Sequence, residues 1–165
     1  MNYILKRWVF ILFILSIIAI CSALFAEHFL DLAPCKMCLK QRYPYYAIIL
    51  LIIVFYFFRK NKNIWLFIIN EMAIIYGLFY AIWHAGIEQK ILNGPSSCSG
   101  KLSKSESIQN LKDQIINQSI VNCSEISWKI FDLSAATINS LVLLLILIFN
   151  TIYIYNYYYG SKKIN

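Results

Sequence analysis

The chain has 165 residues, which is one domain's worth of sequence, and 60% of them are hydrophobic. Only 14% are charged, against about 25% in soluble domains, so the composition indicates a membrane protein. The net charge of +7 is distributed among apolar segments and forms no basic stripe, which argues against a nucleic-acid-binding protein.

The first apolar run covers residues 8–26 and contains no charge. It is long enough to cross the hydrocarbon core of a bilayer, which is about 30 Å thick. A cleaved signal peptide is the alternative, because Cys21-Ser22-Ala23 would be an acceptable cleavage site. The run is long for a signal peptide and continues past that site, and further spans follow. We therefore interpret it as a retained membrane helix.

Three more apolar runs follow, at residues 43–58, 64–83 and 133–159. Runs of this length form helices in lipid, because a helix satisfies its own backbone hydrogen bonds. We therefore predict an all-α membrane protein with a single domain over residues 1–165. Its four transmembrane helices form a bundle, with outer loops at about 27–42 and 84–132.

The basic residues predict the orientation of the bundle. One side has short, purely basic connections, which contain Lys6, Arg7, Arg59, Lys60, Lys62, Lys162 and Lys163. The other side also carries basic residues, but its loops are longer and hold all the acidic residues except Glu71. Short basic connections are the better cytoplasmic signal. We expect both termini in the cytoplasm and both outer loops in an oxidising compartment, which in a bacterium is the periplasm.

The first outer loop contains a Cys-x-x-Cys motif formed by Cys35 and Cys38. Two cysteines at this spacing can close a disulfide or present one activated thiolate. If the chain is helical from Cys38 onward, Cys38 and Arg42 lie at i and i+4 on the same face of the helix. A cation there favours a thiolate, although Arg42 could also be an interfacial anchor.

The second outer loop combines a helical pattern with two more cysteines. A capping box at residues 103–106 and apolar residues over 108–116 predict a short amphipathic helix. This helix would lie on the membrane surface or pack on the bundle. Cys98 and Cys123 bring the number of outer cysteines to four. The four could form two redox-active disulfides or two structural disulfides, or bind zinc, although zinc sites usually contain two closely spaced pairs.

Two residues inside the spans need a role. Glu71 interrupts the third run, and an ionisable residue within a membrane is energetically costly and often functional. Asn139 is a candidate hydrogen-bond partner for it. Cys21 lies in the first run, where we expect a small packing residue.

Three motifs lie near the outer ends of the spans. The first is the Cys-x-x-Cys pair with Gln41 and Arg42 shortly after it. The second is Trp-His-Ala-Gly-Ile-Glu at 83–88, and the third is Cys-Ser-Glu-Ile-Ser-Trp at 123–128. As a set they resemble the DsbB family of bacterial inner-membrane disulfide bond formation proteins. The resemblance covers most of the chain.

The resemblance implies an electron relay that ends at a membrane quinone, either ubiquinone or menaquinone. A reduced thioredoxin-like partner of the DsbA type attacks a disulfide of the second outer loop. This disulfide corresponds to Cys98–Cys123, with Cys98 as the attacked residue. The electrons then pass to the Cys35–Cys38 pair and on to the quinone.

The resemblance also implies a quinone site. Cys38 matches the cysteine that contacts the quinone, and Arg42 matches an arginine close to it. His84 lies at or next to another position of that site, although it could merely cap the third span. We expect Arg42 to hold Cys38 as a thiolate and to donate a hydrogen bond to a quinone oxygen.

The expected function is therefore that of a quinone-dependent enzyme that reoxidises a periplasmic disulfide carrier. One alternative is a related protein dedicated to a single oxidase partner. Another is a membrane protein whose disulfides are purely structural. The vitamin K epoxide reductase type of enzyme is less similar, because it carries its Cys-x-x-Cys motif in a late helix.

Overall fold

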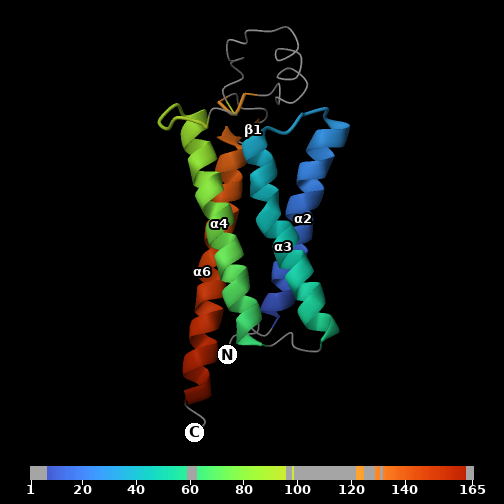
Figure 1. Cartoon of the computed structure of the whole chain (residues 1–165), viewed down its shortest axis with the longest axis vertical. Coiled ribbons are helices and arrows are strands. Elements are labelled where there is room, and N and C mark those ends of the chain that lie inside the picture. Colours follow the sequence, from blue (N-terminus) through green and yellow to red (C-terminus); the bar gives the residue numbers. More distant parts are fainter. Residues whose placement is uncertain are drawn as a thin grey trace, which may run out of the picture.

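The computed structural model describes residues 7–58, 63–95, 98, 122–124, 129–130 and 132–162. The long helices of this part of the chain are α2 (Trp8–Phe29), α3 (Lys36–Phe57), α4 (Ile64–Glu88) and α6 (Ala135–Lys162) (Figure 1). Two short antiparallel strands, β1 (Lys129–Ile130) and β2 (Leu133–Ser134), precede α6. The predicted amphipathic helix at 103–116 lies outside the described residues.

The long helices confirm the predicted four-helix membrane bundle, since each is long and apolar enough to cross a membrane. α4 packs along both α3 and α6, and α2 packs mainly on α3. The starts of α2 and α4 lie at one end of the bundle, together with the ends of α3 and α6 (Figure 1). The cysteine-bearing segments lie at the opposite end.

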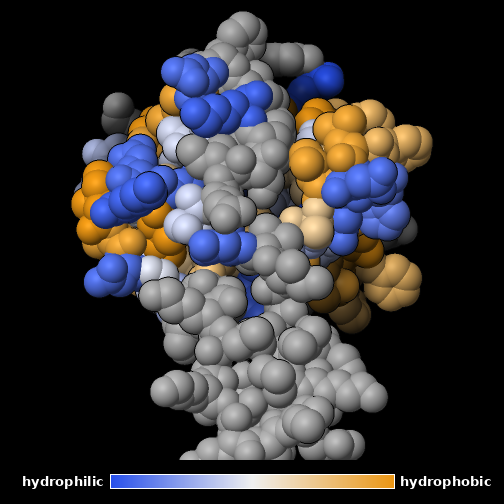
Figure 2. Space-filling view, turned by 90° about the horizontal axis from the view of Figure 1, so that it is seen from above, coloured by the Kyte–Doolittle hydropathy of each residue, from blue (hydrophilic) through white to orange (hydrophobic). Residues whose placement is uncertain are grey.

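The bundle has apolar side chains both inside and outside. The core contains Leu12, Ile48, Phe67 and Leu143, all without exposed surface. The outer faces expose large apolar side chains, including Phe10, Leu50, Met72 and Leu145. Hydrophobic residues lie around the sides of the bundle in the view of Figure 2. Such an outer surface suits lipid rather than water. Cys21, for which we expected a small packing residue, is exposed on this surface and is not part of the buried core.

A close contact between Pro44 and Gly77 sets the packing of α3 on α4. A Cβ atom on Gly77 would lie 2.6 Å from Pro44 Cγ and 3.2 Å from Leu143 Cδ1. Only glycine leaves room for the proline ring here, and a larger residue would force the helices apart. Pro44 is an internal residue of α3, where it cannot donate a backbone hydrogen bond. Its ring packs against Gly77 of α4.

The helices α3 and α4 extend furthest beyond the predicted spans. α3 begins at Lys36 instead of residue 43, because the side chain of Cys35 caps it and the following residues favour helix despite their charges. α4 continues to Glu88 instead of residue 83. The Cys-x-x-Cys motif and His84 therefore belong to helix ends rather than to outer loops.

The partner predicted for Glu71 is wrong. Glu71 accepts hydrogen bonds from Asn150 and Thr151 of α6, and Asn150 also bonds Trp8 Nε1 at 3.0 Å. Asn139 lies 11 residues from Asn150 on the same helix, which is about 16 Å. It is therefore at the other end of the bundle and cannot reach Glu71.

Candidate active site

The Cys-x-x-Cys motif forms the start of α3. Cys35 is the N-cap residue and is buried, and its Sγ accepts a hydrogen bond from Cys38 N at 3.2 Å. Both cysteines are free, and their sulfur atoms are 2.8 Å apart. The partial positive charge of a helix N-terminus stabilises an anion at this position. The helix start therefore favours Cys35 as the thiolate.

The surroundings of Cys35 lower the pKa of its thiol well below the ordinary value. The largest cause is the hydrogen bond from Cys38 Sγ. Burial acts in the opposite direction, and the hydrogen bond of His84 lowers the pKa further. Cys35 is therefore the ionised member of the pair and Cys38 the protonated donor. The sequence-based expectation had placed the thiolate on Cys38.

We expect the thiolate absorbance of the reduced protein to persist well below pH 8, because the pKa of Cys35 is lowered in the folded state. The ionised thiolate stabilises the folded state above the unfolded-state pKa of about 8.5, and this contribution is lost as the pH falls through the folded-state pKa. An ultraviolet pH titration measures it. Cys35→Ser should remove the signal and Cys21→Ser should retain it. A titration midpoint at about 8.5 would contradict the assignment.

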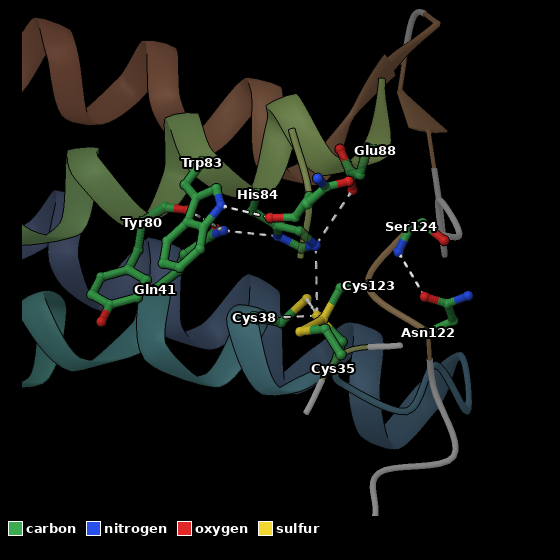
Figure 3. Close-up of a disulfide and its surroundings, with 12 residues drawn as sticks. Cys35, Cys38, Gln41, Tyr80, Trp83, His84, Glu88, Asn122, Cys123 and Ser124 are labelled. Atoms are coloured by element: carbon green, nitrogen blue, oxygen red, sulfur yellow. Dashed lines mark hydrogen bonds and ion pairs between the residues drawn. A yellow bond between two sulfur atoms is a disulfide. The ribbon is translucent and has the colours of Figure 1, made fainter. Parts of the chain in front are cut away.

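His84 reaches the cysteines from α4 (Figure 3). Its Nε2 lies 3.6 Å from Cys35 Sγ and 3.8 Å from Glu88 Oε1, and its Nδ1 lies 2.9 Å from Gln41 Nε2. The ring is only 3% exposed. Ser134, just before α6, donates a hydrogen bond to the other oxygen of Glu88. His84 is therefore part of a buried polar network rather than a cap of α4.

Cys35, Cys38 and His84 lie close enough together to bind one metal ion. The ligand atoms of Cys35, Cys38 and His84 lie within 4.8 Å of one another. Two cysteines and a histidine are a known catalytic zinc ligand set. Cys98 and Cys123 are bonded to each other, so the zinc site of four cysteines that we considered from the sequence is not formed.

Arg42 is held by a different partner from the one we expected. Its Nη1 lies 2.6 Å from Glu27 Oε2 of α2, and its Nη2 donates to Ala23 O at 3.5 Å. Within the described part of the chain, no hydrogen bond joins Arg42 to Cys38. The Arg42 guanidinium therefore links α3 to α2 and neutralises the charge of Glu27.

A cavity of about 440 Å³ lies between the helices beside the thiols. Both cysteines of the Cys-x-x-Cys motif border it. Its apolar wall includes Leu15, Ile18, Ala19, Ala26, Leu32 and Val142. Its polar wall consists mainly of Gln41, Arg42, His84, Glu88 and Asn139. Apolar walls with a few convergent polar groups are typical of sites for small organic molecules.

The second cysteine pair lies against the first. Cys98 and Cys123 form a disulfide, and Cys123 N donates to Cys98 O at 3.2 Å. Both residues are buried in one cluster with Cys35, Met37 and Ile87. Figure 3 shows Cys123 next to the Cys-x-x-Cys motif. The fold thus brings together two cysteine pairs that are far apart in the sequence.

Comparisons with known proteins agree with this site. The profile of the disulfide bond formation protein DsbB matches residues 5–153. The chain belongs to the DsbB family. It is also 28% identical over 141 residues to the uncharacterized protein RP370 of Rickettsia prowazekii (strain Madrid E), which covers 84% of this chain and 81% of that protein. No solved structure gives a significant match. Membership of the DsbB family makes the protein a membrane oxidoreductase of disulfide bond formation.

Several polar residues of this DsbB-family site were not among the predicted site residues. Gln41 lies three residues after Cys38, and Glu88 lies four residues after His84. Helical spacing was therefore a usable signal for both. Asn139 has no such signal, because its contact with Gln41 joins two helices that are distant in sequence.

Proposed function

We propose that this DsbB-family protein passes electrons from a reduced thioredoxin-like carrier of the DsbA type to a membrane quinone. One observation carries the proposal. The Cys35–Cys38 pair, of which Cys35 is buried and Cys38 partly buried, borders the cavity of the bundle and also packs in the same cluster as the Cys98–Cys123 disulfide. Thiol–disulfide exchange requires an attacking thiolate with access to a disulfide sulfur. Adjacent pairs supply that access.

The relay consists of two exchanges that each move two electrons. A thiolate of the carrier attacks Cys98, and Cys123 leaves as a thiolate. The second carrier thiol then attacks the mixed disulfide, which releases the oxidised carrier and leaves both loop cysteines reduced. The reduced Cys98 and Cys123 then reduce a Cys35–Cys38 disulfide by the same exchange. The Cys98–Cys123 disulfide forms again, and Cys35 and Cys38 become a dithiol.

The cavity beside the first pair fits a quinone. Its apolar wall suits a flat lipid-soluble ring, and Arg42 and His84 are the side chains that we propose to hold the ring oxygens. A bound quinone accepts two electrons and two protons. When the Cys35 thiolate and the Cys38 thiol close to a disulfide, they supply two electrons and the one proton of Cys38, and the second proton comes from the solvent, to which Cys35 released its own. The Cys35 thiolate and the Cys38 thiol beside it are therefore suited to the donor side of this exchange.

We also propose the orientation of the bundle. The starts of α2 and α4 and the ends of α3 and α6 lie at the end of the bundle opposite the cysteines, and the sequence next to these helix ends is basic, which supports cytoplasmic termini and periplasmic cysteines in a bacterial inner membrane. A protein with purely structural disulfides has less support, because a structural role needs no free dithiol beside a cavity. A protein dedicated to one oxidase partner would use the same chemistry and differ only in the carrier it accepts.

We expect the purified protein in detergent to consume a soluble ubiquinone or menaquinone analogue when it is given a reduced DsbA-type carrier. Quinone loss and carrier oxidation should occur in equal molar amounts, followed by quinone absorbance and by thiol titration. The carrier with quinone alone and the protein with quinone alone are the controls. No quinone loss in the presence of an active carrier would contradict the proposal.

A further inference from the structure

A chain of hydrogen bonds leads from α3 through α6 to the imidazole beside the thiols. Tyr45 Oη donates to Asn139 Oδ1 at 2.6 Å, and Asn139 Nδ2 donates to Gln41 Oε1 at 2.9 Å. Gln41 Nε2 then lies 2.9 Å from His84 Nδ1 and 3.5 Å from Tyr80 O. Gln41 and His84 are both buried, so these contacts have little competition from solvent.

This series of hydrogen bonds has a defined direction. The Tyr80 carbonyl only accepts hydrogen bonds, so Gln41 turns its amide nitrogen toward α4 and its amide oxygen toward Asn139. The amide nitrogen of Gln41 can only donate a hydrogen bond, so Nδ1 of His84 is the acceptor. In a neutral imidazole whose Nδ1 accepts, the single ring hydrogen is on Nε2.

Both groups that the structure places near Nε2 benefit from a hydrogen there. They are Cys35 Sγ at 3.6 Å and Glu88 Oε1 at 3.8 Å. With the hydrogen on Nδ1 instead, a nitrogen lone pair would face a thiolate and a carboxylate, and the thiolate would lose a donor.

We propose that Asn139 and Tyr45 are positioning residues that act through Gln41 and hold neutral His84 in its Nε2–H tautomer, so that the ring keeps a donor on the Cys35 thiolate. The meaning of this tautomer for catalysis rests on the proposed function. The tautomer itself is a property of the folded protein and is measured without a quinone.

The chain contains two histidines, so histidine-selective ¹⁵N labelling gives the signals of only two rings. His28 is an internal reference, because its Nδ1 lies 3.1 Å from Leu24 O and must carry the hydrogen. We expect opposite tautomers in the reduced, quinone-free protein at a pH where both rings are neutral. His84 should show a protonated Nε2, and His28 a protonated Nδ1.

Asn139→Asp tests the direction of the chain. A carboxylate only accepts, so Gln41 should reverse its amide and present its oxygen to His84. The hydrogen of His84 should then move from Nε2 to Nδ1. Asn156→Asp makes the same change at an exposed position of α6, where the side chain donates a hydrogen bond to Ile152 O at 2.9 Å, and should leave the tautomer unchanged.

Tyr45→Phe removes only the first donor of the chain and should give a mixture of both His84 tautomers. It provides a test with a milder change if Asn139→Asp does not fold. An Nδ1–H tautomer in the wild type would overturn the proposal. So would an unchanged Nε2–H tautomer in a folded Asn139→Asp variant, whose folding is judged from the His28 signal and from circular dichroism. A failure of quinone reduction by the wild type would affect the proposed function alone.

Discussion

Replacement of Cys38 by serine is expected to abolish quinone reduction, with a loss of roughly 1,000-fold or more, the scale seen when an enzyme loses a reacting group. Cys38 borders the cavity, and its sulfur lies 2.8 Å from Cys35 Sγ. Serine cannot form a disulfide, so the first pair could neither receive nor release electrons. Quinone absorbance in the presence of a reduced carrier measures the loss.

A matched control exists within the same chain. Cys21 is a free cysteine exposed on the lipid-facing side of α2, away from both pairs, so Cys21→Ser should keep full activity. Circular dichroism should show that Cys38→Ser still forms the helical bundle, because the Cys38 backbone N–H that bonds Cys35 remains. Quinone reduction by Cys38→Ser at a rate close to that of the wild type would remove the first pair from the reaction.

Replacement of both Cys98 and Cys123 by serine should separate the two halves of the relay. Oxidation of the protein carrier should fall to the uncatalysed level, because the disulfide that the carrier attacks is gone. Reduction of quinone by a small dithiol should continue, because the Cys35–Cys38 pair and the cavity are intact. Carrier thiol titration measures the first activity, and quinone absorbance measures the second.

The double variant also tests the structural alternative. If the Cys98–Cys123 disulfide only holds the loop, its removal should lower the thermal unfolding midpoint and leave carrier oxidation by the folded protein unchanged. Carrier oxidation by the double variant at the wild-type rate would therefore contradict the relay. Loss of both activities together with helical structure would instead mean that the disulfide is needed for folding.

The four helices were predictable because the signal for a membrane span is local. An uncharged run of about 20 apolar residues has only one way to satisfy its backbone in lipid. The ends of the helices were less predictable, because hydropathy falls at the first charged residue, whereas a charged residue does not end a helix. Lys36 and Arg42 both favour helix, and Cys35 supplies the cap, so α3 starts inside the motif that we had assigned to a loop.

The cysteine motif was also visible as a contiguous pattern, and the structure places Arg42 and His84 at the cavity beside it. The contacts of the polar residues there were not predictable, because they join residues separated by 43 positions for Gln41 and His84 and by 98 for Gln41 and Asn139. Each residue along a helix turns the side chain by about 100°, so a small change in rotation selects different partners. Packing of Pro44 on Gly77 sets that rotation and depth. The sequence therefore predicts helices and a redox motif, and the packing of the helices decides which polar side chains surround the thiols.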